Sequence, residues 1–154
     1  MRIKQLIIDT EILTPVITLI AKSLIILMRM YATRIPAMSK AKVDVDQLVK
    51  DPDASLDRSL PANVQWKAHN YAHLMEQPTV FYPAVVILAV MGAGTVDVAL
   101  AWIYVALRII HSLYQATVNV VKIRFLIFLL ATIVLTILAV RAVMVTLFAD
   151  PGVL

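Results

Sequence analysis

Residues 124–148 of the chain read RFLIFLLATIVLTILAVRAVMVTLF, and this stretch decides the fold class. Its only charged residues are Arg124 at the start and Arg141 near the end. A helix that crosses the hydrocarbon core of a bilayer needs about 20 predominantly apolar residues, which this stretch supplies. We therefore interpret the segment from about 123 to 148 as a transmembrane helix.

Three more apolar segments lie upstream, and each is long enough to cross a membrane. The expected helices are about 6–37, 64–92 and 96–120. Lys22 interrupts the first of them, and we expect it to face other helices or to extend toward the membrane surface. Arg141 near the end of the fourth segment is likewise expected to reach the membrane surface. Four such segments predict an all-α integral membrane four-helix bundle, with residues 1–154 forming one domain.

The composition supports the same fold class. Of 154 residues, 61% are hydrophobic and 16% are charged, whereas soluble domains are about half apolar and a quarter charged. The absence of cysteine excludes disulfides, thiolate metal sites and a cysteine nucleophile. A net charge of +4 would suggest nucleic acid for a soluble protein. Here the basic residues cluster at the ends of apolar runs, so we expect no nucleic-acid partner.

The polar segment 39–63, SKAKVDVDQLVKDPDASLDRSLPAN, is expected to be a loop of unusual length, which suggests a functional cap. Lys and Arg are concentrated in this loop, at its borders and just before the fourth helix. The positive-inside rule therefore places the loop in the cytoplasm and both termini outside it. Asp9 and Glu11 interrupt the first apolar run, so we expect a mature helix there and not a cleaved signal peptide.

Two segments carry polar residues that a passive membrane helix would not need. In WKAHNYAHLMEQP, residues 66–78, the helical period places His69, His73 and Glu76 on one face, which Asn70 overlaps. In RIIHSLYQATVNVVKIR, residues 108–124, it places Arg108, His111 and Gln115 on one stripe. These faces are expected to meet near the cytoplasmic ends of their helices and to line a basic cavity with one carboxylate.

Such a cavity suits a small anionic ligand that also carries an ammonium group, because Arg binds carboxylates and Glu holds an amine. An arginine beside a thiol also stabilises its thiolate, the nucleophilic form. Two other readings stay open. The polar side chains can simply bond between helices or meet lipid headgroups. A divalent metal ion could also be held by four of them, His69, His73, Glu76 and His111.

The sequence resembles the MAPEG family, the membrane-associated proteins of eicosanoid and glutathione metabolism. The resemblance rests on chain length, four apolar spans, a long basic loop after the first span and motifs in the later spans. These motifs are Trp66-Lys67-Ala68 followed by Asn70, Glu76 and Pro78, then Arg108-x-x-His111, then Arg124 at the start of the fourth span.

The resemblance implies a homotrimer that binds glutathione between neighbouring subunits at the cytoplasmic side. Arg124 matches the arginine that stabilises the glutathione thiolate, and Arg34 matches one at the lipid-substrate end. The resemblance further implies glutathione contacts from Lys67, Asn70, His73, Glu76, Arg108, His111 and Gln115. It also implies membrane lipids and a lipophilic small molecule as partners, and a location in the bacterial inner membrane.

The chain departs from the family pattern at several of these positions. Eicosanoid enzymes of the family place Glu three residues after Asn, whereas His73 stands three residues after Asn70 here, and Glu76 six after it. Phe125 and Phe128 occupy positions that can carry Ser and Tyr. Two functions are therefore weighed together. One is a membrane-bound glutathione-dependent transferase or peroxidase acting on lipophilic electrophiles, and the other is a non-enzymatic lipid-binding or scaffold protein of the same fold.

Overall fold

A computed structural model provides the structure of the protein and describes residues 10–44, 46, 50 and 55–148. These residues form helices and connecting turns, with no strand in the described ranges. The helices are α1 (Leu13–Lys40), α3 (Leu56–Ser59), α4 (Ala62–Glu76), α5 (Pro78–Met91), α6 (Thr95–Thr117) and α7 (Val121–Leu147). The all-α prediction is therefore confirmed.

Each predicted span contains a helix, but the boundaries differ. Helix α1 begins at Leu13 and ends at Lys40, against the predicted 6–37; residues 6–9 lie outside the described part of the chain. Helix α6 ends at Thr117, three residues before the predicted end, because Asn119 adopts a left-handed conformation (φ 53°) that starts the turn into α7. Helix α7 runs Val121–Leu147 where 123–148 was expected.

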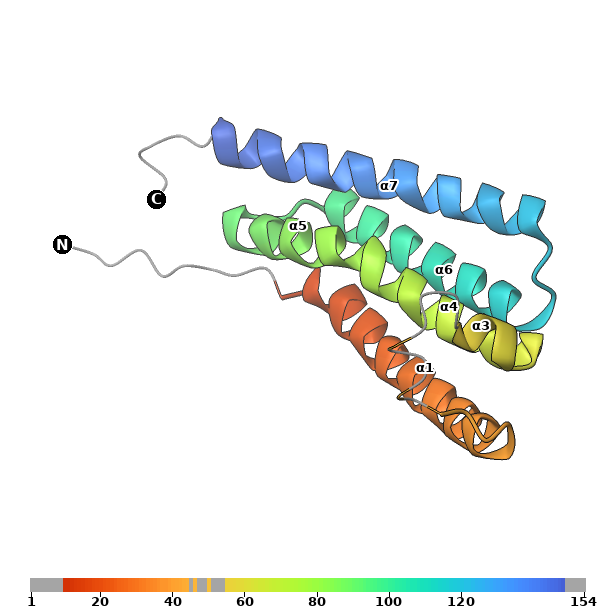
Figure 1. The fold of residues 1–154 in the computed structure, drawn as a ribbon. Coiled ribbons are helices and arrows are strands. Elements are labelled where there is room, and N and C mark those ends of the chain that lie inside the picture. Colours follow the sequence, from red (N-terminus) through yellow and green to blue (C-terminus); the bar gives the residue numbers. More distant parts are fainter. Residues whose placement is uncertain (1–9, 45, 47–49, 51–54, 149–154) are drawn as a thin grey trace.

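The second span was predicted as one helix over 64–92, and it consists of two. Helix α4 ends at Glu76 and α5 begins at Pro78. Pro78 has no backbone N–H, so it cannot donate the hydrogen bond that would close the helical turn at this point. Gln77 between them keeps helical dihedral angles (φ −61°, ψ −38°), so α4 and α5 follow one another in nearly one direction (Figure 1).

Four spans are long and apolar enough to cross a membrane, with 28, 30, 23 and 27 residues. They alternate in direction, so α1 begins and α7 ends at the same end of the bundle, as Figure 1 shows. We call this the termini-side end. The opposite end, which carries α3 and the turn between α6 and α7, we call the loop-side end. The fold is a four-helix membrane bundle, as predicted.

Helices α4, α5 and α6 form the centre of the bundle, with α1 and α7 packed on either side of them (Figure 1). Phe81 of α5 and Tyr104 of α6 stack in the core with ring centroids 4.5 Å apart, and both are fully buried. The outer faces of α1 and α7 are apolar as well, for example at Ile25, 60% exposed, and Ile133, 50% exposed. Apolar outer faces are what hydrocarbon surroundings require.

An ion pair joins α6 and α7 near the termini-side end. Asp97 is buried and accepts hydrogen bonds from the guanidinium of Arg141. Its second oxygen also accepts the backbone N–H of Gly94 at 2.9 Å, which satisfies a donor at the start of α6. Arg141 was expected to reach the membrane surface; the structure adds that Asp97 on the neighbouring helix holds its guanidinium, while its side chain stays 40% exposed.

Lys22 of α1 was predicted either to face other helices or to extend toward the membrane surface. It faces another helix. Its ammonium nitrogen lies 2.6 Å from the backbone carbonyl oxygen of Arg108 in α6 and donates a hydrogen bond to it. A cation inside a membrane span is costly unless polar groups surround it. The contact therefore ties α1 to the centre of the bundle through a polar group.

The Asp97–Arg141 pair predicts unequal effects of two substitutions. Arg141→Met leaves a buried carboxylate without its cation and should lower the free energy of unfolding by about 3 kcal/mol or more. Asp97→Asn should lower it by about 1 kcal/mol, because Arg141 is 40% exposed and can turn outward. Thermal unfolding in detergent measures both. The double variant should cost less than the sum, and an Asp97→Asn effect larger than that of Arg141→Met would contradict the asymmetry.

The distribution of basic residues predicts that the loop-side end faces the cytoplasm. Because the chain contains no cysteine, single cysteines can report on each end without a background. Ala41→Cys at the loop-side end and Thr95→Cys at the termini-side end are both exposed positions. In intact cells a membrane-impermeant maleimide should label Thr95→Cys alone, and both after lysis. Labelling of Ala41→Cys alone in intact cells would reverse the orientation.

Candidate functional site

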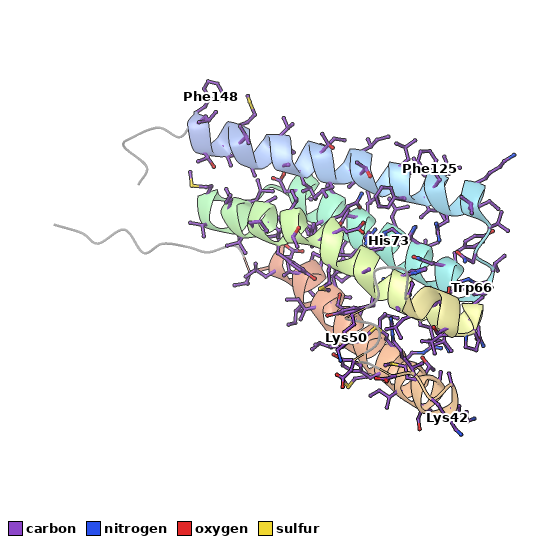
Figure 2. The ribbon with its side chains drawn as sticks, viewed as in Figure 1. Lys42, Lys50, Trp66, His73, Phe125 and Phe148 are labelled. Atoms are coloured by element: carbon purple, nitrogen blue, oxygen red, sulfur yellow. The ribbon has the colours of Figure 1, made fainter. Side chains whose placement is uncertain are left out.

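A cavity of about 210 Å³ lies near the loop-side end between α4, α6 and α7. It is lined by His73, His111, Val121, Arg124, Phe125 and Phe128. The sequence segments that predicted a basic cavity, 66–78 and 108–124, thus contribute His73, His111 and Arg124 to one space. Figure 2 labels His73 on α4 and Phe125 on α7, at the two sides of this region.

Three rings form one wall of the cavity. The imidazoles of His73 and His111 meet edge to face, with centroids 6.0 Å apart and planes at 89°. The Phe128 ring lies 6.3 Å from His73 and 6.0 Å from His111. Edge-to-face and tilted contacts at these distances are favourable for aromatic rings. The cluster gives the cavity a wall of low polarity next to its cationic group.

Arg124 lies in the first turn of α7, and the turn before it sets its position. Its Nη1 atom donates a hydrogen bond to Asn119 Oδ1 over 2.9 Å. Asn119 has positive φ, a conformation that Asn tolerates better than most residues, and its N–H donates to the carbonyl of Tyr114 at 2.9 Å. One residue therefore closes the end of α6 and holds the guanidinium. Arg124 is half-buried, so its charge is accessible to a ligand.

His73 and Glu76 form a hydrogen-bonded pair on α4, with His73 Nδ1 and Glu76 Oε2 3.0 Å apart. The Glu76 side chain is 56% exposed, and the pair places a carboxylate beside the cavity. Glu76 therefore bonds to the residue that stands three positions after Asn70. Asn70, one turn earlier, points elsewhere: its Nδ2 donates to the carbonyl of Ser112 in α6 at 3.2 Å.

Arg108 does not line the cavity but contacts the main chain of His73, which does. Its guanidinium is buried and donates to the backbone carbonyl of His73 and, at 3.5 Å, to Gln77 Oε1. Gln77 Nε2 in turn donates to Thr132 Oγ1 of α7 over 2.6 Å. The guanidinium therefore ties α6 to the junction of α4 and α5, and through Gln77 to α7. These contacts hold His73 in place from the main-chain side.

The predicted site residues thus fall into four groups. Three line the cavity, namely His73, His111 and Arg124, and two contact His73, namely Glu76 and Arg108. Asn70, which bonds to α6, and Gln115 are both buried and do not line the cavity. Arg34 near the end of α1 and Lys67 near the start of α4 do not line it either. The binding role of each residue remains a prediction.

Sequence reasoning missed two positioning residues, Gln77 and Thr132, which connect the Arg108 guanidinium to α7. The available signal at Gln77 was an amide directly before Pro78, at the point where a helix must lose a hydrogen bond. Thr132 carried no signal, because a threonine in an apolar span ordinarily bonds to its own helix. It does so here as well, donating to the carbonyl of Phe128 at 2.8 Å.

The metal reading finds no support in the geometry. Within the described ranges, no three His, Asp or Glu side chains are placed to hold one ion. His73 and Glu76 bond directly to each other, and His69 lies on an exposed part of α4. The four residues of that reading therefore do not converge.

The comparison with protein families agrees with the fold. A scan against protein families matches residues 12–144 to the MAPEG family, which spans α1 to α7. No curated protein and no solved structure gives a match. The family match covers most of the 154 residues and confirms the resemblance that the motifs of the second, third and fourth spans indicated. The chain belongs to the MAPEG family.

Proposed function

We propose that the cavity binds glutathione and that the protein is a membrane-bound glutathione-dependent transferase or peroxidase acting on lipophilic electrophiles. One observation carries the proposal: Arg124 lies in an aromatic-walled cavity beside two imidazoles and the Glu76 carboxylate. Glutathione offers two carboxylates, an ammonium group and a thiol. Arg124 suits an anionic group of this tripeptide, and Glu76 suits its ammonium group.

The balance of charge supports an anionic ligand. In the described part of the chain, Asp97 pairs with Arg141 at the far end, and Glu76 pairs with His73. No described carboxylate forms an ion pair with Arg108 or Arg124. Cations within a membrane span are expensive unless an opposite charge compensates them. A bound anion would supply that compensation near the loop-side end.

The size of the cavity supports the homotrimer that the family resemblance implies. Pockets for small ligands usually measure about 300–1,000 Å³, and this cavity measures about 210 Å³. A single subunit therefore surrounds only part of a tripeptide. We propose that a neighbouring subunit completes the site. Arg34 does not line the cavity of its own subunit, and in the trimer it would approach the cavity of a neighbour.

Arg124 has the properties that thiol activation needs. A guanidinium next to the sulfur favours the thiolate, and the low polarity of the Phe128 side strengthens that attraction. In conjugation the thiolate forms a carbon–sulfur bond, the leaving group departs with its electron pair, and the thiol proton passes to water. The protein contributes electrostatic stabilisation and positioning, and no covalent intermediate is needed.

A non-enzymatic lipid-binding function is the second candidate, and two adjoining cavities favour it. They lie between α5 and α7, measure about 370 and 360 Å³, and are almost entirely apolar. Both include Val80, Ala139 and Val143 in their lining. Apolar hollows of this kind suit hydrocarbon chains. Lipid that stays bound through purification, in a protein that neither binds nor conjugates glutathione, would favour this candidate.

Glutathione binding tests the first proposal directly. Calorimetry on the detergent-purified protein should show binding that Arg124→Ala weakens by about 1.5–3 kcal/mol, the range for a hydrogen bond to a charged group. Lys122→Ala is the matched control, because Lys122 is an exposed cation in the same turn that does not line the cavity. Its affinity should stay at the wild-type level. No binding by the wild type at millimolar glutathione would sink the proposal.

Conjugation activity separates the role of Arg124 in catalysis from its role in binding. With a chloronitrobenzene as the electrophile, Arg124→Ala should lower kcat/KM by about 10²–10³-fold, as removal of a charge-stabilising group does. Arg124→Lys should retain part of the rate, because it keeps the charge but loses the planar guanidinium. Release of chloride, followed with the thioether product, measures turnover. Equal rates for wild type and Arg124→Ala would remove Arg124 from the mechanism.

A further inference from the structure

His73 differs from the other residues that line the cavity, because it is bonded to a carboxylate. Its Nδ1 atom lies 3.0 Å from Oε2 of Glu76, about one turn later on α4. An ionised carboxylate only accepts hydrogen bonds, so the proton between the two groups belongs to Nδ1. In a neutral imidazole the other nitrogen, Nε2, then carries no proton and can accept one. The pair therefore supplies the cavity with a base.

The Nε2 atom is available to a ligand, and the ring that carries it is held in place. In the part of the chain that the structure describes, Nε2 has no hydrogen-bond partner. The ring lines the cavity and meets the rings of His111 and Phe128. The main-chain carbonyl of His73 accepts a hydrogen bond from Arg108. A general base must be held within hydrogen-bond reach of the proton that it removes, and these contacts fix the position of the imidazole.

The charges in this region decide which of the two imidazoles in the cavity can take up a proton. The charged and titratable groups around His73 are Glu76 of α4, Arg108 and His111 of α6, Arg124 of α7 and, through the Arg108 carbonyl, Lys22 of α1. The Glu76 carboxylate bonds to the His73 ring directly, so it offsets the positive charge of a protonated imidazole. The groups that act electrostatically on His111 are Arg108, His73, Arg124 and Lys22, with no carboxylate among them. His73 is therefore the imidazole that is suited to accept a proton.

We propose that the His73–Glu76 pair is the general base of the site, and that His73 Nε2 accepts the thiol proton of bound glutathione. The sulfur–hydrogen bond breaks, its electron pair stays on sulfur, and the proton forms an imidazolium that Glu76 stabilises. The thiolate then forms the carbon–sulfur bond while the leaving group departs with its electron pair. The imidazolium finally releases its proton to water. This inference rests on the proposed function and adds a catalytic residue to it.

His73 and Arg124 have different roles in this step. Arg124 attracts the thiolate but cannot accept the proton, because a guanidinium is already fully protonated. His73 accepts the proton, and the resulting imidazolium is a second cation beside the thiolate, as in the cysteine–histidine pairs of thiol enzymes. Glu76 Oε2 holds the ring, which leaves Oε1 for the ammonium group of the tripeptide. Glu76 is therefore a positioning residue for His73.

A proton count on glutathione binding tests the proposal. The full chain in detergent is mixed with glutathione in weakly buffered solution at about pH 7.5, where free glutathione is mostly a thiol. Ultraviolet absorbance measures the thiolate that forms, and a pH indicator measures the protons that are released. S-Methylglutathione, which has no thiol, supplies the correction for protons from other groups. We expect thiolate to form with almost no proton release, because His73 retains the proton. His73→Gln should release one proton for each thiolate that it still forms.

The outcomes of this count separate the role of His73 from the proposed function. If the wild type forms thiolate and releases one proton for each, the role of His73 is wrong and glutathione-dependent function still stands. Binding of glutathione without thiolate would also overturn the role of His73. Absence of glutathione binding would remove the proposed function itself, and the inference with it.

The pH dependence of conjugation at saturating glutathione gives a second readout. At about pH 7, His73→Gln should lower kcat by about 10²-fold, at the lower end of the range for general base catalysis. Its rate should recover toward that of the wild type as the pH rises to about 9, where the thiol ionises without a base. Such recovery also shows that the variant is folded. The same fractional loss at every pH would overturn the proposal.

His69→Gln is the matched control for this profile. His69 is an exposed histidine one turn earlier on α4 and does not line the cavity. The variant removes an imidazole from the same helix without touching the pair that we propose as the base. Its kcat should equal that of the wild type at every pH, and a loss equal to that of His73→Gln would contradict the assignment to His73.

Histidine ¹⁵N NMR of the protein without glutathione tests the geometry on its own. In the wild type, the His73 signals, assigned through His73→Gln, should show a proton on Nδ1 and none on Nε2. Glu76→Gln should shift the ring toward the opposite tautomer and lower kcat at saturating glutathione, because an amide does not select the proton on Nδ1 as a carboxylate does. A proton on Nε2 of His73 in the wild type would overturn the proposal.

Discussion

The buried guanidinium of Arg108 is the interaction on which the rest of the bundle depends. Hydrocarbon offers no hydrogen bonds, so every polar group in a span must find its partners within the protein. Arg108 finds them at the junction of α4 and α5, through the carbonyl of His73 and the amide of Gln77, which also reaches Thr132 of α7. Its own carbonyl accepts Lys22 of α1. All four spans are thus joined through one residue.

Much of this arrangement was predictable from the sequence, because the underlying rules are local. Uninterrupted apolar runs indicate spans by length alone, and helical periodicity places His73 with Glu76, and Arg108 with His111. Those predictions depend on neighbours within two turns of a helix. Arg124 was predicted as a site residue from the family motifs, because helical periodicity cannot relate a residue of the fourth span to residues of the second. The structure places its guanidinium in the cavity with His73 and His111.

The remaining features depend on contacts between distant segments, and single-helix patterns do not contain them. Asn70 shares a helix face with His73 closely enough for the same site to be expected, yet the packing of α4 against α6 turns it toward Ser112. The ion pair of Arg141 was not predicted, because its partner Asp97 lies 44 residues earlier in the chain and no pattern within α7 indicates it. The hydrogen-bond acceptor of Lys22, the carbonyl of Arg108, was likewise not predictable, because it lies 86 residues later in the chain.

The break at Gln77 separates two mechanical units within one span. No hydrogen bond from residue 78 crosses it, because Pro78 has no N–H, whereas Arg108 fixes the α4 side at His73. Bilayers of different thickness impose different tilts on the helices that cross them. A tilt of α5 can be absorbed at the break without moving His73 and Glu76. The part of the cavity that this span supplies, His73, is therefore separated from a tilt of α5.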